Sequence, residues 1–141
     1  PSEYLISGTS GLDGLLFEGT IEGQGTSYAV IYPNSMATSV YGPDNLSGND
    51  IRLVGSYRTS DYATAPVEVT GFIFEGTTAD LNTQANYRTI DYPGAKFNYV
   101  HSTMGGLVVG NYDSPADHGQ FSLPLGKIEE AWRAPIPAAM G

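Results

Sequence analysis

Residues 14–20 read GLLFEGT and residues 71–77 read GFIFEGT, so five of seven positions are identical in two segments whose first residues are 14 and 71. The likeness continues downstream, where Tyr32-Pro33 matches Tyr92-Pro93 and the segment LVGSY at 53–57 matches VVGNY at 108–112. Self-similarity at a nearly constant spacing is the sequence signature of a repeat architecture. The chain therefore contains two copies of one structural unit.

Each copy predicts four short strands, because apolar and polar residues alternate in segments that Gly and Pro separate. In the first copy, residues 14–57, the expected strands are 14–19, 27–32, 38–41 and 51–57. In the second copy, residues 71–112, they are 70–75, 87–92, 96–102 and 107–112. Residues 5–8 match the last strand of a preceding copy.

A third copy begins at residues 117–121 and departs from the pattern at Pro124. Residues 113–141 are therefore expected to hold a partial third repeat and a C-terminal tail, in which residues 127–134 have a helical composition. A length of 141 residues allows one domain with a real core. We expect residues 1–141 to form a single all-β domain.

Four short antiparallel strands in roughly 40 to 60 residues are the period of a β-propeller blade. The predicted fold is therefore an antiparallel meander of two four-stranded repeats of the blade type. A propeller closes with roughly four to eight blades, so two copies leave two alternatives open. Either several chains complete a ring, which predicts a homo-oligomer, or the strands of one chain close into a β-barrel or form a sandwich.

Composition limits the possible partners. Six Lys and Arg stand against fifteen Asp and Glu, giving a net charge of −9, which repels the phosphate backbone of nucleic acids. No apolar run approaches the ~20 residues of a membrane span, so we expect neither nucleic acid nor a membrane as partner. The chain contains no Cys, which excludes thiolate catalysis and disulfides.

Three segments of the second copy resemble the bacterial extracellular repeats of the HAF family. They are GFIFEG at 71–76, YRTIDYPGA at 87–95 and GLVVGNY at 106–112. In HAF repeats a Gly-Phe-Leu strand, a Thr-Ile-Asp-x-Pro-Gly-Ala strand and turn, and a Gly-x-Ile-Val-Gly-x-Tyr strand recur in this order. The resemblance implies a β-propeller-like array outside the cell or at its surface, and it transfers no catalytic residues because the family has no settled activity.

The second copy departs from both the first copy and the HAF pattern around residues 99–104 and after residue 112. Tyr rings can stack on sugar rings and Tyr hydroxyls can bind sugar hydroxyls, while Asp and His add polar contacts. We therefore expect a non-enzymatic recognition module for a glycan or another small-molecule ligand. The candidate binding residues are Tyr99, His101, Tyr112, Asp113, Asp117 and His118.

Two other functions stay open. One is a small enzyme with an enclosed apolar pocket in which His101 acts as acid and base; no Gly-x-Ser-x-Gly elbow or readable triad supports nucleophilic catalysis. The other is a structural repeat that assembles with itself. No cofactor is expected; if the loop after residue 112 held Ca²⁺, Asp113 and Asp117 would be its ligands.

Overall fold

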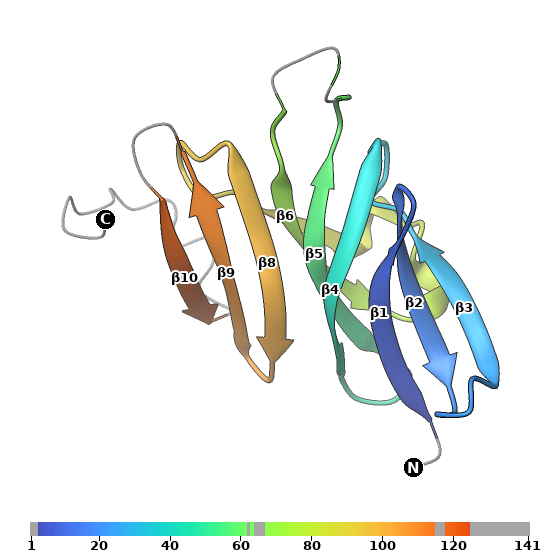
Figure 1. Cartoon of the computed structure of the whole chain (residues 1–141). Helices are drawn as coiled ribbons and strands as arrows, with labels where there is room; N and C mark the ends of the chain where they lie inside the picture. The colour runs from blue at the N-terminus through green and yellow to red at the C-terminus, as the bar shows by residue number, and fades with distance from the viewer. Residues whose placement is uncertain (1–2, 62, 64–66, 115–117, 125–141) are drawn as a thin grey trace.

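The computed structural model describes residues 3–61, 63, 67–114 and 118–124, and within them the chain is almost entirely β-strand (Figure 1). Two short 3₁₀ helices, Thr78–Asp80 and Gln84–Asn86, lie in one loop. The strands of this part of the chain are β1 (Tyr4–Ser10), β2 (Asp13–Gly19), β3 (Gly25–Val30), β4 (Ala37–Asn45), β5 (Ile51–Arg58), β6 (Thr70–Gly76), β7 (Tyr87–Ile90), β8 (Phe97–Met104), β9 (Leu107–Asp113) and β10 (His118–Pro124).

The strands form three antiparallel meanders. The first sheet has the order β1-β2-β3, the central sheet β4-β5-β6-β7 and the third sheet β10-β9-β8. The all-β prediction is confirmed, and each strand expected from the sequence is present with shifted ends. In the described part of the chain no sheet closes on itself, so the barrel alternative is wrong.

The prediction of two four-stranded blades is also wrong, because each sequence repeat is divided between two sheets. The first copy supplies β2 and β3 to the first sheet and β4 and β5 to the central sheet. The second copy supplies β6 and β7 to the central sheet and β8 and β9 to the third. The chain crosses from one sheet to the next in the middle of each copy.

A tight turn at the Tyr-Pro pair makes this crossing. The amide of Ser35 donates to the carbonyl of Tyr32 at 2.9 Å, and Asn34, the second of the two residues between them, has φ 65°. In the second copy the same bond runs from Ala95 to Tyr92 at 3.0 Å, with Gly94 at φ 79°. Pro followed by a residue of positive φ is the sequence of a type II turn. This turn redirects the chain, so the strands on its two sides join different sheets.

A buried side chain six residues after each turn tyrosine fixes the crossing. The amide of Tyr32 donates to the hydroxyl of Thr38 at 2.9 Å, and the amide of Tyr92 donates to the side-chain oxygen of Asn98 at 2.8 Å. Thr38 and Asn98 are each 1% exposed. A buried amide without an acceptor costs about 1–3 kcal/mol, so these two acceptors stabilise the crossing.

We expect Asn98→Val to lower the free energy of unfolding by about 2–3 kcal/mol, because Tyr92 loses its acceptor. Asn98→Thr supplies the hydroxyl that the first copy uses at Thr38, and valine and threonine have the same shape. The threonine variant should therefore be more stable than the valine variant by about 1 kcal/mol or more, measured by urea unfolding. Equal unfolding midpoints for the two variants would show that the acceptor does not stabilise the turn.

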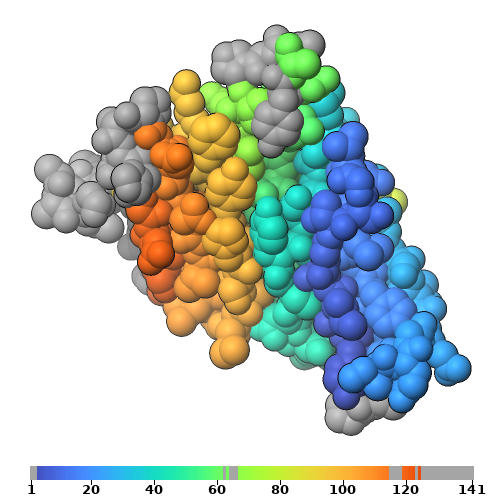
Figure 2. All heavy atoms as spheres, viewed as in Figure 1, coloured from blue at the N-terminus to red at the C-terminus, as the bar shows by residue number. Residues whose placement is uncertain are grey.

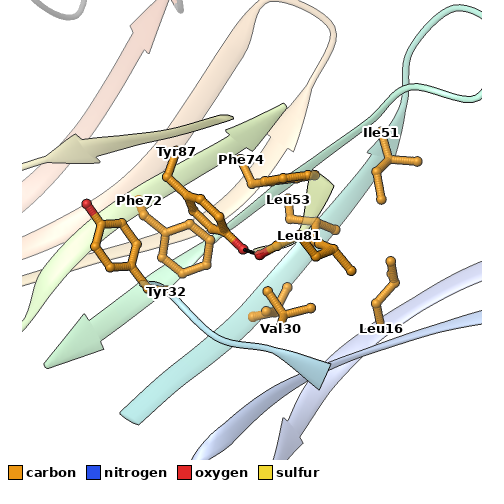
Figure 3. Packing of buried hydrophobic residues seen from close by; sticks show 10 residues of the cluster. Leu16, Val30, Tyr32, Ile51, Leu53, Phe72, Phe74, Leu81 and Tyr87 are labelled. Atoms are coloured by element: carbon orange, nitrogen blue, oxygen red, sulfur yellow. Dashed lines mark hydrogen bonds between the residues drawn. The ribbon is translucent and has the colours of Figure 1, made fainter. Parts of the chain in front are cut away.

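Two hydrophobic cores lie between the three sheets. The first core joins Leu16 and Val30 of the first sheet to Leu53, Phe72 and Phe74 of the central sheet. Figure 3 shows these side chains pointing toward one another from the two sheets. The second core joins the central and third sheets, and its members are Val54, Ile73, Ile90, Val100, Val108, Tyr112 and Phe121. The sheets are therefore layered face to face, and the central sheet is buried on both faces.

This layering gives every sheet two distinct faces. We call the face directed toward the preceding sheet the upstream face; in the central sheet it carries Leu53, Phe72 and Phe74. The opposite, downstream face of the central sheet carries Val54 and Ile73. Because side chains alternate along a strand, one sequence segment such as β6 contributes to both cores.

A stacked pair of tyrosines recurs in both cores. The rings of Tyr32 and Tyr57 lie 3.6 Å apart and within 3° of parallel, and those of Tyr92 and Tyr112 lie 3.7 Å apart and within 4°. Each pair joins the turn after the last strand of one sheet to the second strand of the next sheet. The tyrosines that the two copies share are therefore core residues.

Candidate ligand-binding site

Two β-bulges place an aromatic side chain at the edges of the central and third sheets. In β4 the register shifts between Val40 and Gly42, and in β8 it shifts between Val100 and Ser102. The residues left over are Tyr41 and His101, which occupy equivalent positions of the two copies. A bulge re-aims the side chain of the extra residue, and such irregularities are common next to functional sites.

These bulges bring three rings together in what we call the aromatic row: Tyr41, Tyr99 and His101. The ring centres of Tyr41 and His101 lie 5.4 Å apart, and those of Tyr99 and His101 lie 6.0 Å apart with an interplanar angle of 13°. Tyr41 is 43% exposed, His101 is exposed and Tyr99 is half-buried. The edge strands that carry the row, β4 and β8, are in contact, and their atoms adjoin in Figure 2. The row is an open surface of ring faces and edges.

Polar side chains border the aromatic row. Nε2 of His101 donates a hydrogen bond to the side-chain oxygen of Asn111 on β9, which orients the imidazole. A hollow of about 870 Å³ lies against this part of the third sheet, and its described lining includes His101, Asn111, Gln120 and Ser122. Amide and hydroxyl groups of this kind can both donate and accept hydrogen bonds.

A second, smaller hollow of about 90 Å³ also borders the row. Its lining includes Tyr41 and Tyr99 together with Ser39, Ser56 and Arg58. Tyr41 and Tyr99 belong to different strands and different sheets, so the hollow bridges the central and third sheets. The aromatic row therefore borders two hollows, each lined by rings and by groups that can hydrogen-bond.

The structure brings together two of the six residues that the sequence singled out, Tyr99 and His101. Asp113 is exposed at the end of β9, opposite His118 of β10 in the register, and it also borders the larger hollow. Asp117 lies outside the described residues. Tyr112 is 3% exposed and stacked on Tyr92, so its ring belongs to the core and we leave it out of the proposed site.

Sequence reasoning missed Tyr41 and Asn111. The signal for Tyr41 was present, because the match between Tyr32 and Tyr92 also aligns Tyr41 with His101. Asn111 could not have been found in this way, because its contact with His101 depends on the pairing of β8 with β9 across a bulge. The bulge itself leaves no distinctive sequence pattern.

The structure bears on the other chemical expectations as well. Among the described residues, no three His, Asp or Glu side chains gather closely enough to hold a metal ion. The enzyme alternative requires an enclosed pocket around His101, and His101 is exposed. Within the described part of the chain no helix is long and apolar enough to cross a membrane.

Comparison of the chain with protein-family models, curated proteins and solved structures finds no match. The functional argument therefore starts from the geometry of the aromatic row.

Proposed function

We propose that this protein is a non-enzymatic recognition module that binds a neutral glycan on the aromatic row. The single observation that carries the proposal is that equivalent bulges in the two copies aim Tyr41 and His101 at the same place, where Tyr99 extends the row. A sugar presents a face of C–H groups that packs on an aromatic ring, with hydroxyls around its rim. Three adjacent rings suit consecutive sugar residues.

The polar groups beside the row support the same ligand class. Asn111, Gln120 and Ser122 border one hollow, and Ser39 and Ser56 border the other, so hydroxyls on either side of a stacked sugar would find hydrogen-bonding partners. Asp113 and the net charge of −9 disfavour an acidic sugar or a phosphorylated ligand. A location outside the cell or at its surface is part of the proposal and rests on the HAF resemblance.

A glycan array followed by titration calorimetry tests this proposal. We expect a neutral oligosaccharide to be retained, and Tyr41→Ala and Tyr99→Ala each to weaken its binding about tenfold, because each removes one stacking surface. Met36→Ala is the matched control, since Met36 is as exposed as Tyr41 at 43% but lies outside the row. The proposal fails if no sugar binds at millimolar concentration, or if Met36→Ala weakens binding as much as the tyrosine variants.

A further inference from the structure

The upstream face of the first sheet is apolar and uncovered by described residues. Leu16 faces the first core, so its neighbours Leu15 and Phe17 face the other way, and the register places Gly8 and Ile6 beside them. Ile6 is 54% exposed, and Leu15 and Phe17 are half-buried. Contiguous apolar side chains on an open sheet face mark an interaction surface.

This face repeats the upstream face of the central sheet position by position. Ile6 pairs with Phe17 in the first sheet as Leu53 pairs with Phe74 in the central sheet, and the two segments GLLFEGT and GFIFEGT align these residues. In the central sheet Leu53 and Phe74 are 0% exposed, because the downstream face of the first sheet covers them. The first sheet keeps the same docking residues without the layer that would cover them.

The downstream face of the third sheet is likewise left uncovered by the described residues. Met104 and Leu107 face each other across β8 and β9 and are 80% and 48% exposed. The residue of the first sheet equivalent to Leu107 is Leu5, which packs against the first core. Leu5 therefore packs between the first two sheets, whereas Leu107, at the same position of the third sheet, is exposed.

We infer that a second copy of this chain covers these faces, with the upstream face of one copy's first sheet packed against the downstream face of the other copy's third sheet. Within the chain, a downstream face covers an upstream face twice, so the intramolecular layers are the template for the contact. Such an interface joins unlike surfaces, so it extends head to tail and generates a ring or an open filament.

Two features of the chain shape this association. A net charge of −9 on each copy opposes it, so association should strengthen as salt screens the repulsion. The aromatic row stays open, because a bulge residue remains at the sheet edge when its sheet is covered: Tyr41 is 43% exposed although the third sheet packs on the downstream face of the central sheet. The larger hollow lies on the covered face, because Asn111, Gln120 and Ser122 share the downstream side of the third sheet with Leu107, so association should compete with glycan binding there. Association is measured without a glycan, so its test stands apart from the test of the proposed function.

Sedimentation velocity of the intact chain over a series of concentrations tests the inference. We expect the mean sedimentation coefficient to rise with protein concentration and with salt. Ile6→Lys should raise the concentration of half-association about tenfold or more, because it places a charge in the apolar contact. Ile21→Lys makes the same chemical change at a residue that is 75% exposed in the turn between β2 and β3, and it should associate like the unaltered chain.

A mixing experiment identifies the two surfaces. Ile6→Lys and Leu107→Asp should each be monomeric alone, yet a mixture should form a heterodimer through the two unaltered faces and grow no further. If Leu107→Asp alone still dimerises, the contact joins two upstream faces and the head-to-tail arrangement is wrong. If the unaltered chain sediments as a monomer at every concentration and salt, or if Ile21→Lys behaves like Ile6→Lys, the inference is overturned.

Discussion

Replacing Gly55 by alanine is expected to lower the free energy of unfolding by about 3 kcal/mol or more, which is a large share of the stability of a small domain. A Cβ atom at Gly55 would lie 1.9 Å from the carbonyl oxygen of Ser39 on β4 and 3.0 Å from the ring of Phe72. Ser39 lies in the strand that pairs with Gly55, and its backbone oxygen cannot move away without disturbing the sheet. Gly110 should behave alike, because a Cβ there would lie 2.0 Å from the carbonyl oxygen of Tyr99.

The matched control for this prediction is Gly8, which holds the same repeat position in the first sheet. Among the described residues nothing lies within 4 Å of a Cβ at Gly8, because no described strand pairs with the free edge of β1. Gly8, Gly55 and Gly110 all lack a positive φ, so the three substitutions differ in contact alone. Gly8→Ala should change stability by less than about 0.5 kcal/mol in urea unfolding. A loss as large as that of Gly55→Ala would contradict the equivalence of the three positions.

The strands themselves were predictable because the repeat shows each one twice. The alternation in residues 14–19 is weak by itself, but its return at 71–76 makes a shared strand the simplest interpretation. The two partial copies also contain strands, because residues 5–8 fall within β1 and residues 118–121 fall within β10. Local pattern and turn residues are sufficient for this level of structure.

The grouping of strands into sheets was not predictable from the repeat. A repeating sequence defines the length of the repeat but not its phase, which is the strand at which each sheet begins. A unit that starts at β2 and a unit that starts at β4 describe the same array. The phase depends on which connection crosses between sheets, and the crossing depends on long-range contacts such as Tyr32 on Tyr57. The turn after Tyr32 and its acceptor Thr38 are the local features that mark the crossing.

The candidate site was predicted in part for a similar reason. Tyr99 and His101 drew attention because they differ from the first copy, whereas Tyr112 is shared as Tyr57 and is a core residue in both. Residues common to repeats serve the shared core, so a difference between copies is the better indicator of a site. Tyr41 became part of the site only when the bulges placed it beside His101.

Raising the pH above 10 is expected to unfold the protein, because two tyrosines hold their protons more tightly in the folded state. Burial raises the pKa of Tyr57 above its ordinary value, and a hydrogen bond with Tyr32 raises it further. Burial also raises the pKa of Tyr87, whose hydroxyl donates to the carbonyl of Leu81 at 2.6 Å, as Figure 3 shows. The unfolded chain therefore ionises first, near the ordinary tyrosine pKa of about 10.

The sign of the effect follows from this order of ionisation. The contribution of both tyrosines to stability is complete below about pH 10 and is lost as the pH rises toward their folded-state pKa values. Each tyrosine can lower the free energy of unfolding by about 1.4 kcal/mol per pH unit in this range, so the two together can exhaust the stability of a marginal domain within a few pH units.

Tyr57→Phe tests this account, because it keeps the ring that stacks on Tyr32 and removes the proton. Urea unfolding as a function of pH should give a shallower decline above pH 10 for this variant, with the difference in slope approaching one proton. The two stability curves should therefore converge or cross as the pH rises, even if the lost hydrogen bond costs about 1 kcal/mol at pH 7. Because every other titrating group is common to both proteins, parallel curves would mean that Tyr57 ionises alike in the folded and unfolded chains, and that burial in the first core does not hold its proton.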